Sequence, residues 1–215
     1  MFDGQPRVSA TGASLVRAFN WHWAGGRPLL FGATVVAAAA INWLAGLIVN
    51  TARLPIFGDT LGTVLVGVLF GPTAGAVTGA ISNLGGAIYN PLLPWFIMTA
   101  AAVGFLAGIA GGLSWMRRPW RAVLFGGGVG LVSAAISAPV SAAVSAGATP
   151  SGLYTVLVAT ARTQGLSIFQ STYVASLATD PLDKAVTFGL VSIIVSLLPG
   201  HLHARFPGAR AEDRS

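Results

Sequence analysis

The sequence predicts an all-α membrane protein: a polytopic helix bundle of six transmembrane helices with an additional amphipathic segment on its outer face. Composition is the first reason, because 54% of the 215 residues are hydrophobic and 8% are charged, whereas a soluble domain carries roughly a quarter charged residues. The long apolar runs also lack the alternation of barrel strands. At about 20 residues per span, the length allows at most six or seven helices in one domain.

The charge and the cysteine content exclude several kinds of bond and binding site. The chain has no cysteine, which excludes disulfides and thiolate metal sites, and its net charge is +6. The basic residues stand at the ends of apolar runs, so they indicate membrane topology rather than binding of nucleic acid. His201 and His203 are typical of a solvated tail beside the membrane, and we expect no metal site.

The N-terminal residues precede the first long apolar run. We expect 1–27 to form a cytoplasmic tail without a cleavable signal peptide, because its arginines flank no long apolar core. Residues 14–23 predict either an interfacial helix, anchored by Trp21 and Trp23, or a disordered tail. The membrane domain then covers 28–200, and 201–215 form a cytoplasmic C-terminal tail.

The first two expected spans flank a polar loop. The first runs from Pro28, a residue suited to a helix start, to about Asn50. In it Ala33 and Ala37 share a face that another helix could approach closely. After the loop 51–58, Asp59 opens a second helix as an N-cap or first-turn residue.

The third expected helix follows a turn at Gly71-Pro72 and reaches about Tyr89. Glycine recurs every fourth residue through this hairpin, which favours close helix packing. The stretch 53–91 is apolar but contains scattered polar side chains, and polar groups inside such a stretch are by default candidates for a functional site.

Three further spans are expected, at about 95–115, 122–146 and 183–198. The fifth carries glycine, alanine and serine at four-residue spacing, which we interpret as close packing, and Pro139 should kink it. Residues 147–181 mix apolar and polar side chains and predict one or two amphipathic helices that form a lid, a re-entrant hairpin or a loop.

The distribution of basic residues supports six crossings with both termini in the cytoplasm. If 152–178 do not cross, nine of the twelve basic residues lie on the side of the termini and three on the other side. A seventh crossing would remove this bias, which follows the positive-inside rule. The loop before Asp59 and the segment 152–178 then share the outer face.

Several motifs resemble those of a known family. They are Leu54-Pro55-Ile56-Phe57-Gly58-Asp59-Thr60-Leu61-Gly62-Thr63, Phe70-Gly71-Pro72 with Gly75, Ser82-Asn83-Leu84, Asp180-Pro181-Leu182-Asp183-Lys184 and Leu198-Pro199. In this order and spacing, over about 30–205, the chain resembles the substrate-binding S component of energy-coupling factor (ECF) vitamin transporters.

The resemblance implies a six-helix plasma-membrane protein that binds a vitamin or precursor near the outer face, gated by the loop between its first two helices. It implies a transmembrane coupling subunit and two ATPases as partners, with Ala33 and Ala37 matching the pattern that contacts the coupling subunit. The chain itself would use no cofactor and catalyse no reaction, because ATP would be hydrolysed by the partners.

The candidate substrate-binding residues are polar or aromatic side chains expected near the outer face. Asp59 could accept hydrogen bonds from a substrate or cap its helix, and Thr60 and Thr63 could bond the substrate or the preceding turn. The amide of Asn83 needs a partner, either another helix or the ligand. Asp183 and Lys184 could contact the ligand, or cap the last helix and pair locally.

The remaining candidates lie at the ends of helices or in the amphipathic segment. Tyr89, Asn90 and Trp95 could stack on a planar ring or anchor at the interface. Arg162 could pair with an anionic substrate group or with Asp180 or Asp183. Gln164 and Gln170 complete the set of candidates.

Two other classes of function compete with a nutrient-binding subunit. Similar helical sets precede kinase domains, so a membrane sensor that binds a small ligand is the alternative, although only a short tail follows the last expected span. A lipid-modifying enzyme is disfavoured by the shortage of paired histidines and carboxylates near the spans.

Overall fold

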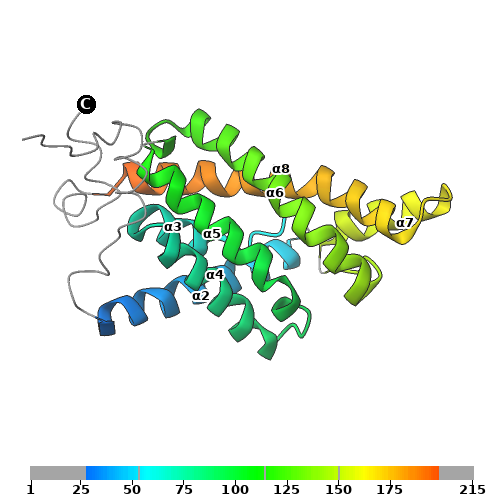
Figure 1. The fold of residues 1–215 in the computed structure, drawn as a ribbon, viewed down its shortest axis with the longest axis horizontal. Coiled ribbons are helices and arrows are strands. Elements are labelled where there is room, and N and C mark those ends of the chain that lie inside the picture. The colour runs from blue at the N-terminus through cyan, green and yellow to red at the C-terminus, as the bar shows by residue number, and fades with distance from the viewer. Residues whose placement is uncertain (1–27, 53, 114, 150, 199–215) are drawn as a thin grey trace, which may run out of the picture.

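The computed structural model describes residues 28–52, 54–113, 115–149 and 151–198, and throughout these ranges the regular structure is helical. This confirms the all-α class. The expected interfacial helix at 14–23 and the tail after residue 200 lie outside the described residues. Figure 1 shows an elongated bundle, with α2 on one side and the long pair α6 and α8 on the other.

Three helical segments are long and apolar enough to cross a membrane: Leu29–Thr51, Leu93–Gly112 and Pro119–Ser145. The first lies in α2 (Pro28–Thr51) and the third in α6 (Pro119–Ser145). The second combines the 3-10 helix η3 (Leu93–Phe96) with α5 (Ile97–Gly112). The chain is therefore a helical protein of membrane-like character, with α3 (Leu61–Phe70) as a shorter apolar helix.

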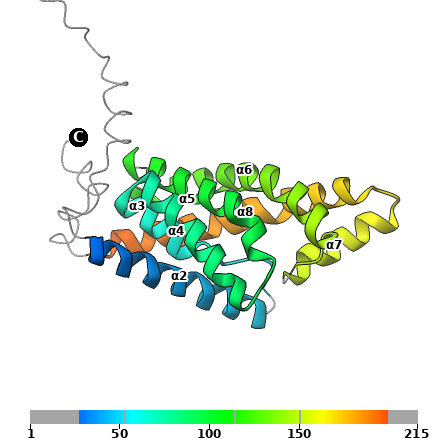
Figure 2. The ribbon, with the colours of Figure 1, turned by 60° about the horizontal axis from the view of Figure 1, so that its bottom comes forward.

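Successive long helices alternate in direction, as contacts at one end of the molecule show. The ring of Phe31, near the start of α2, lies 6.4 Å from that of Phe70 at the end of α3. Met116, in the 3-10 helix η4 (Trp115–Arg117), accepts a hydrogen bond from Ser192 near the end of α8 (Ile168–Ser196). Figure 2 shows α7 (Gly152–Thr163) at the opposite end.

The α3–α4 hairpin packs on α5 through glycine. Gly71, with φ 102°, turns the chain into α4 (Pro72–Gly85). A Cβ at Gly75 would lie 2.2 Å from the carbonyl oxygen of Gly104, and one at Gly79 would lie 2.4 Å from that of Ala100. Since a Cβ cannot fit at these distances, the glycine ladder serves the close packing that the sequence predicts.

Helices α6 and α8 approach equally closely. A Cβ at Gly130 would lie 2.3 Å from the Cα of Pro181, and one at Gly126 would lie 2.4 Å from the carbonyl oxygen of Lys184. Both helices continue through an internal proline, Pro139 in α6 and Pro181 in α8.

The last helix begins at Ile168, well before the expected start near Asp183, so that prediction was wrong. The helix start is fixed by a capping box, in which Ser167 accepts from the backbone of Gln170 and the Gln170 side chain accepts from the backbone of Ser167. The turn before it contains Gly165 at φ +87°. Residues 147–181 are thus divided between α7 and the first half of α8.

Candidate ligand-binding cavity

A cavity of about 550 Å³ lies between the helices, below the loop that joins α2 to α3. Helices α2, α4, α5, α6, α7 and α8 all contribute to its wall. The wall is mainly apolar, with five aromatic side chains: Trp43, Phe57, Tyr89, Phe96 and Tyr154. A cavity of this size with a few polar groups is typical of small-molecule sites.

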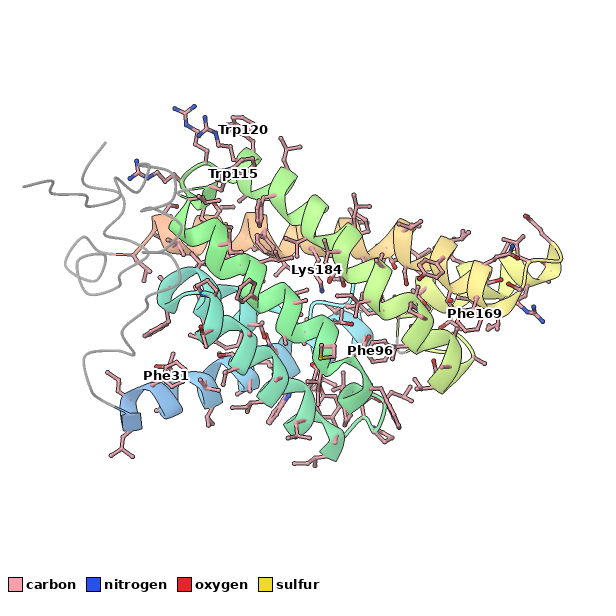
Figure 3. All side chains as sticks on the ribbon, in the orientation of Figure 1. Phe31, Phe96, Trp115, Trp120, Phe169 and Lys184 are labelled. Atoms are coloured by element: carbon pink, nitrogen blue, oxygen red, sulfur yellow. The ribbon has the colours of Figure 1, made fainter. Side chains whose placement is uncertain are left out.

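Lys184 supplies the cationic group of this cavity. It projects from α8 into the middle of the molecule, on the side of Phe96 (Figure 3), and is only 4% exposed. Its Nζ donates to Asp183 Oδ2 and, at 3.0 Å, to Thr60 Oγ1. An ammonium group removed from water needs such partners, and the bond to Thr60 ties α8 to the start of α3.

Asp183 is fully buried and connects α8 to the α2–α3 loop. While its Oδ2 accepts from Lys184, its Oδ1 accepts from the backbone N–H groups of Phe57 and Gly58, both at 2.9 Å. Gly58 has φ +68°, and a Cβ there would lie 2.6 Å from the side chain of Val49. One carboxylate therefore holds the loop over the cavity and neutralises the buried lysine.

Asp59 follows directly in the same loop and lines the cavity. Its side chain is 33% exposed, and its Oδ1 lies 3.9 Å from Lys184 Nζ. Burial raises the pKa of Asp59 above its ordinary value, whereas the positive charge of Lys184 lowers it. It makes no side-chain cap of α3, whose N-cap is Thr60, so the helix-cap alternative does not describe it.

Asp180, one turn before Lys184, brings a second carboxylate to the wall. Its Oδ2 accepts hydrogen bonds from Ser133 at 3.0 Å and from Ser137 at 2.9 Å. The serine spacing of α6 thus supplies hydrogen bonds as well as close packing. Sequence reasoning proposed Asp180 only as a partner of Arg162 and gave these serines no role in the site.

Asn42 was also absent from the candidate residues, although it lies beside the cavity wall. Its Nδ2 donates to Thr63 Oγ1 at 2.8 Å and to Ser82 Oγ at 3.0 Å, and its Oδ1 accepts from the backbone of Gly62 at 2.7 Å. This amide joins α2, α3 and α4. Thr63 is 1% exposed and serves this cluster rather than the wall.

Asn83 differs from Asn42 in having no partner. It lines the cavity and is 6% exposed, yet its side-chain amide makes no hydrogen bond to any described residue. The sequence left open whether this amide bonds another helix or a ligand. The Asn83 amide therefore faces the cavity with its hydrogen-bonding capacity unused, and the hydroxyl groups of Thr99 and Ser141, which also line the wall, are buried without a partner among the described residues.

The other candidates divide between the wall and the outside. Tyr89 and Asn90 line the cavity, and the Tyr89 ring lies 6.3 Å from that of Trp43, nearly perpendicular to it. Trp95 is 60% exposed and does not line the cavity.

The polar residues of the amphipathic segment also lie outside the wall. Arg162 donates to the carbonyl of Leu166 at 2.8 Å, Gln164 is exposed, and Gln170 belongs to the capping box. Ala33 and Ala37 are exposed on α2, away from the cavity.

Among the described residues, no group of three potential ligands could hold a metal ion. His201 and His203 lie outside these residues. The chain matches no protein-family model, no curated protein and no solved structure with significance.

Proposed function

We propose that this chain is the membrane-embedded substrate-binding subunit of an ECF-type importer. In this proposal it captures a vitamin or related small nutrient at the outer face and delivers it inward together with a coupling subunit and two ATPases. The observation that carries the proposal is the cavity of about 550 Å³, which contains an unpaired buried amide and lies under a loop tied down by Asp183.

The residues behind the family resemblance support this assignment by their position. Asp59 and Thr60 from the first motif, Asn83 from the third, and Asp180 and Lys184 from the fourth all line one cavity. These motifs are far apart in the sequence and have different local roles. Their convergence on one wall is expected of a binding site and is not required for packing a bundle.

We further propose that α2, α3, α4, α5, α6 and α8 each cross the membrane, with both termini cytoplasmic. Six successive crossings in alternating directions would bring both termini to one side. Helix α7 is left out because it lies at one end of the molecule (Figure 2), and not because of its length, since α3 has only 10 residues. The charges of Asp180, Asp183 and Lys184 face inward in α8, where buried partners satisfy them.

Helix α2 offers a surface for the lipid or the coupling subunit. Its outer side exposes large apolar residues, including Leu29 at 89%, Val36 at 67% and Leu47 at 63%. Ala33 lies on the same exposed side. An apolar surface of this extent favours contact with lipid or another membrane helix over contact with water.

The test is affinity purification of the full chain from its native membranes in mild detergent, followed by mass spectrometry of both proteins and small molecules. We expect a coupling subunit and ATPases to co-purify and a nutrient-sized compound to be retained. A retained compound without ATPases would favour the membrane sensor. Absence of both would contradict the proposal.

A further inference from the structure

The charged groups around the cavity carry an excess of negative charge. Its charged lining residues are Asp59, Asp180 and Lys184, and the buried Asp183 lies directly behind the lysine. Three carboxylates therefore surround one ammonium. No arginine, and no second lysine, is among the described residues that line the wall.

The ammonium of Lys184 is already occupied. It donates to Asp183 and to Thr60 and is held between the carboxylates of Asp183 and Asp59. An anionic ligand would have to displace these partners inside a low-dielectric site, where breaking a buried ion pair is expensive. The wall therefore lacks a cation that is free to receive a carboxylate or a phosphate.

Asp59 is the accessible carboxylate. A third of its side chain is exposed, and among the described residues it accepts no side-chain hydrogen bond. Its distance of 3.9 Å from Lys184 Nζ exceeds that of a hydrogen bond. The carboxylate contacts its own backbone N–H and retains capacity for a donor that enters the cavity, and a charged donor would form the stronger bond.

The remaining wall suits a flat ring with a polar edge. Trp43 and Tyr89 form one aromatic pair, and Phe57 and Tyr154 form a second, with ring centroids 6.0 Å apart. Aromatic faces attract organic cations. The unpaired amide of Asn83, more than nine-tenths buried, can both donate and accept at the edge of such a ring.

We propose that the cavity selects a compact organic cation, a ring-bearing molecule whose protonated or quaternary nitrogen faces Asp59 and whose polar edge pairs with Asn83. This inference rests on the proposed function, because it assigns the chemical class of the nutrient to the same site. It excludes free carboxylates and phosphate esters as preferred ligands.

The test compares three molecules that share one ring and differ in charge: 1-methylnicotinamide (cation), nicotinamide (neutral) and nicotinate (anion). Binding to the full chain in phosphatidylcholine nanodiscs is measured by calorimetry at neutral pH. We expect the cation to bind about tenfold more tightly than the neutral amide, as an ion pair with the Asp59 carboxylate would give, and nicotinate to bind most weakly.

Two variants test which residues bind the cationic nitrogen and the amide group. Asp59→Asn should reduce the preference for the cation over nicotinamide to about twofold or less, which corresponds to loss of the ion pair with the carboxylate. Asn83→Leu should weaken both amides while keeping the cation ahead. Asp213→Asn makes the same change of charge outside the described residues and should leave all three affinities unchanged. If Asp59→Asn does not fold, the order of affinities in the unmodified chain still decides.

Tightest binding of nicotinate, equal binding of all three, or no binding of any would overturn the inference. The proposed function has a separate readout, co-purification with ATPases. If the chain co-purifies with ATPases but prefers nicotinate, the proposed function stands and the inference of a cationic ligand is wrong. If the chain prefers the cation but does not co-purify with ATPases, the cationic ligand stands and the proposed function is wrong.

Discussion

Two buried asparagines, Asn42 in α2 and Asn83 in α4, occupy neighbouring helices but have opposite environments. Asn42 is 1% exposed, with both its oxygen and its nitrogen hydrogen-bonded across three helices. Asn83 is 6% exposed and has no partner among the described residues. The first holds three helices together, and the second lines the cavity. Hydrogen bonding, more than burial, thus distinguishes these two asparagines.

The same contrast divides the ionic groups. Asp183 has both oxygens hydrogen-bonded, whereas Asp59, in the same network, has its carboxylate at the cavity surface. We therefore expect substitution of the hydrogen-bonded Asp183 to reduce stability and substitution of Asp59, whose carboxylate faces the cavity, to reduce binding. The predictions that follow go from the largest effect to the smallest.

Lys184→Met should cause the largest loss of stability. It leaves Asp183 fully buried without its ammonium, and removal of one partner of a buried ion pair costs about 3–5 kcal/mol. The free energy of unfolding, measured in detergent by denaturant titration, checks this. The double variant Lys184→Met with Asp183→Leu should be more stable than the single variant. If Lys184→Met alone is as stable as the unmodified chain, the buried network of Lys184 and Asp183 does not stabilise the fold.

Asn42→Leu should reduce the free energy of unfolding by about 2–3 kcal/mol, because it leaves the backbone N–H of Gly62 and the hydroxyl groups of Thr63 and Ser82 buried without this partner. The change keeps the side-chain volume roughly constant, so packing contributes little. Thermal unfolding in the same detergent provides the measurement. An unchanged midpoint would show that the cluster finds other partners.

Asn83→Leu is the matched control, since it makes the same substitution one helix away. It should change the free energy of unfolding without ligand by less than about 0.5 kcal/mol, because no hydrogen bond to a described residue is lost. A loss as large as that of Asn42→Leu would mean that Asn83 has a structural role and would remove the contrast.

Gln164→Ala should have the smallest effect. Gln164 is exposed and does not line the cavity, and surface substitutions of this kind change stability by less than about 0.5 kcal/mol. Both unfolding and ligand retention should match the unmodified chain. Reduced retention would bring α7 into the binding site and redefine its boundary.

Local sequence patterns predicted the turns and the closely packed helix faces better than they predicted which residues contact each other. The turn at Gly71 and the glycine spacing of α4 depend on local geometry, and both appear in the fold. The start of α8 was missed although Ser167 and Gln170 have the spacing of a capping box, a signal present in the sequence. The expected start near Asp183 left Pro181 outside the last span, because the effect of a proline inside a helix depends on the facing helix, which the sequence does not identify.

The site could be predicted only in part for the same reason. The polar residues of the stretch 53–91 were suspected because they interrupt an apolar run, and Asp59, Thr60 and Asn83 line the cavity. Asn42 was not identified as a candidate, because its hydrogen-bond partners lie 20 and 40 residues away in the sequence. Arg162 and Gln170 drew attention as polar groups, but local backbone contacts occupy them.

The most direct test of the central claim, that the cavity around Asn83 holds a small molecule, is quantitative mass spectrometry of compounds retained by the purified chain. The unmodified chain and Asn83→Leu are purified in parallel in the same detergent and compared at equal protein concentration. We expect one compound at near-equimolar amounts with the unmodified chain and at least about tenfold less with the variant. Equal retention by both chains, or no retained compound in either, would contradict the claim.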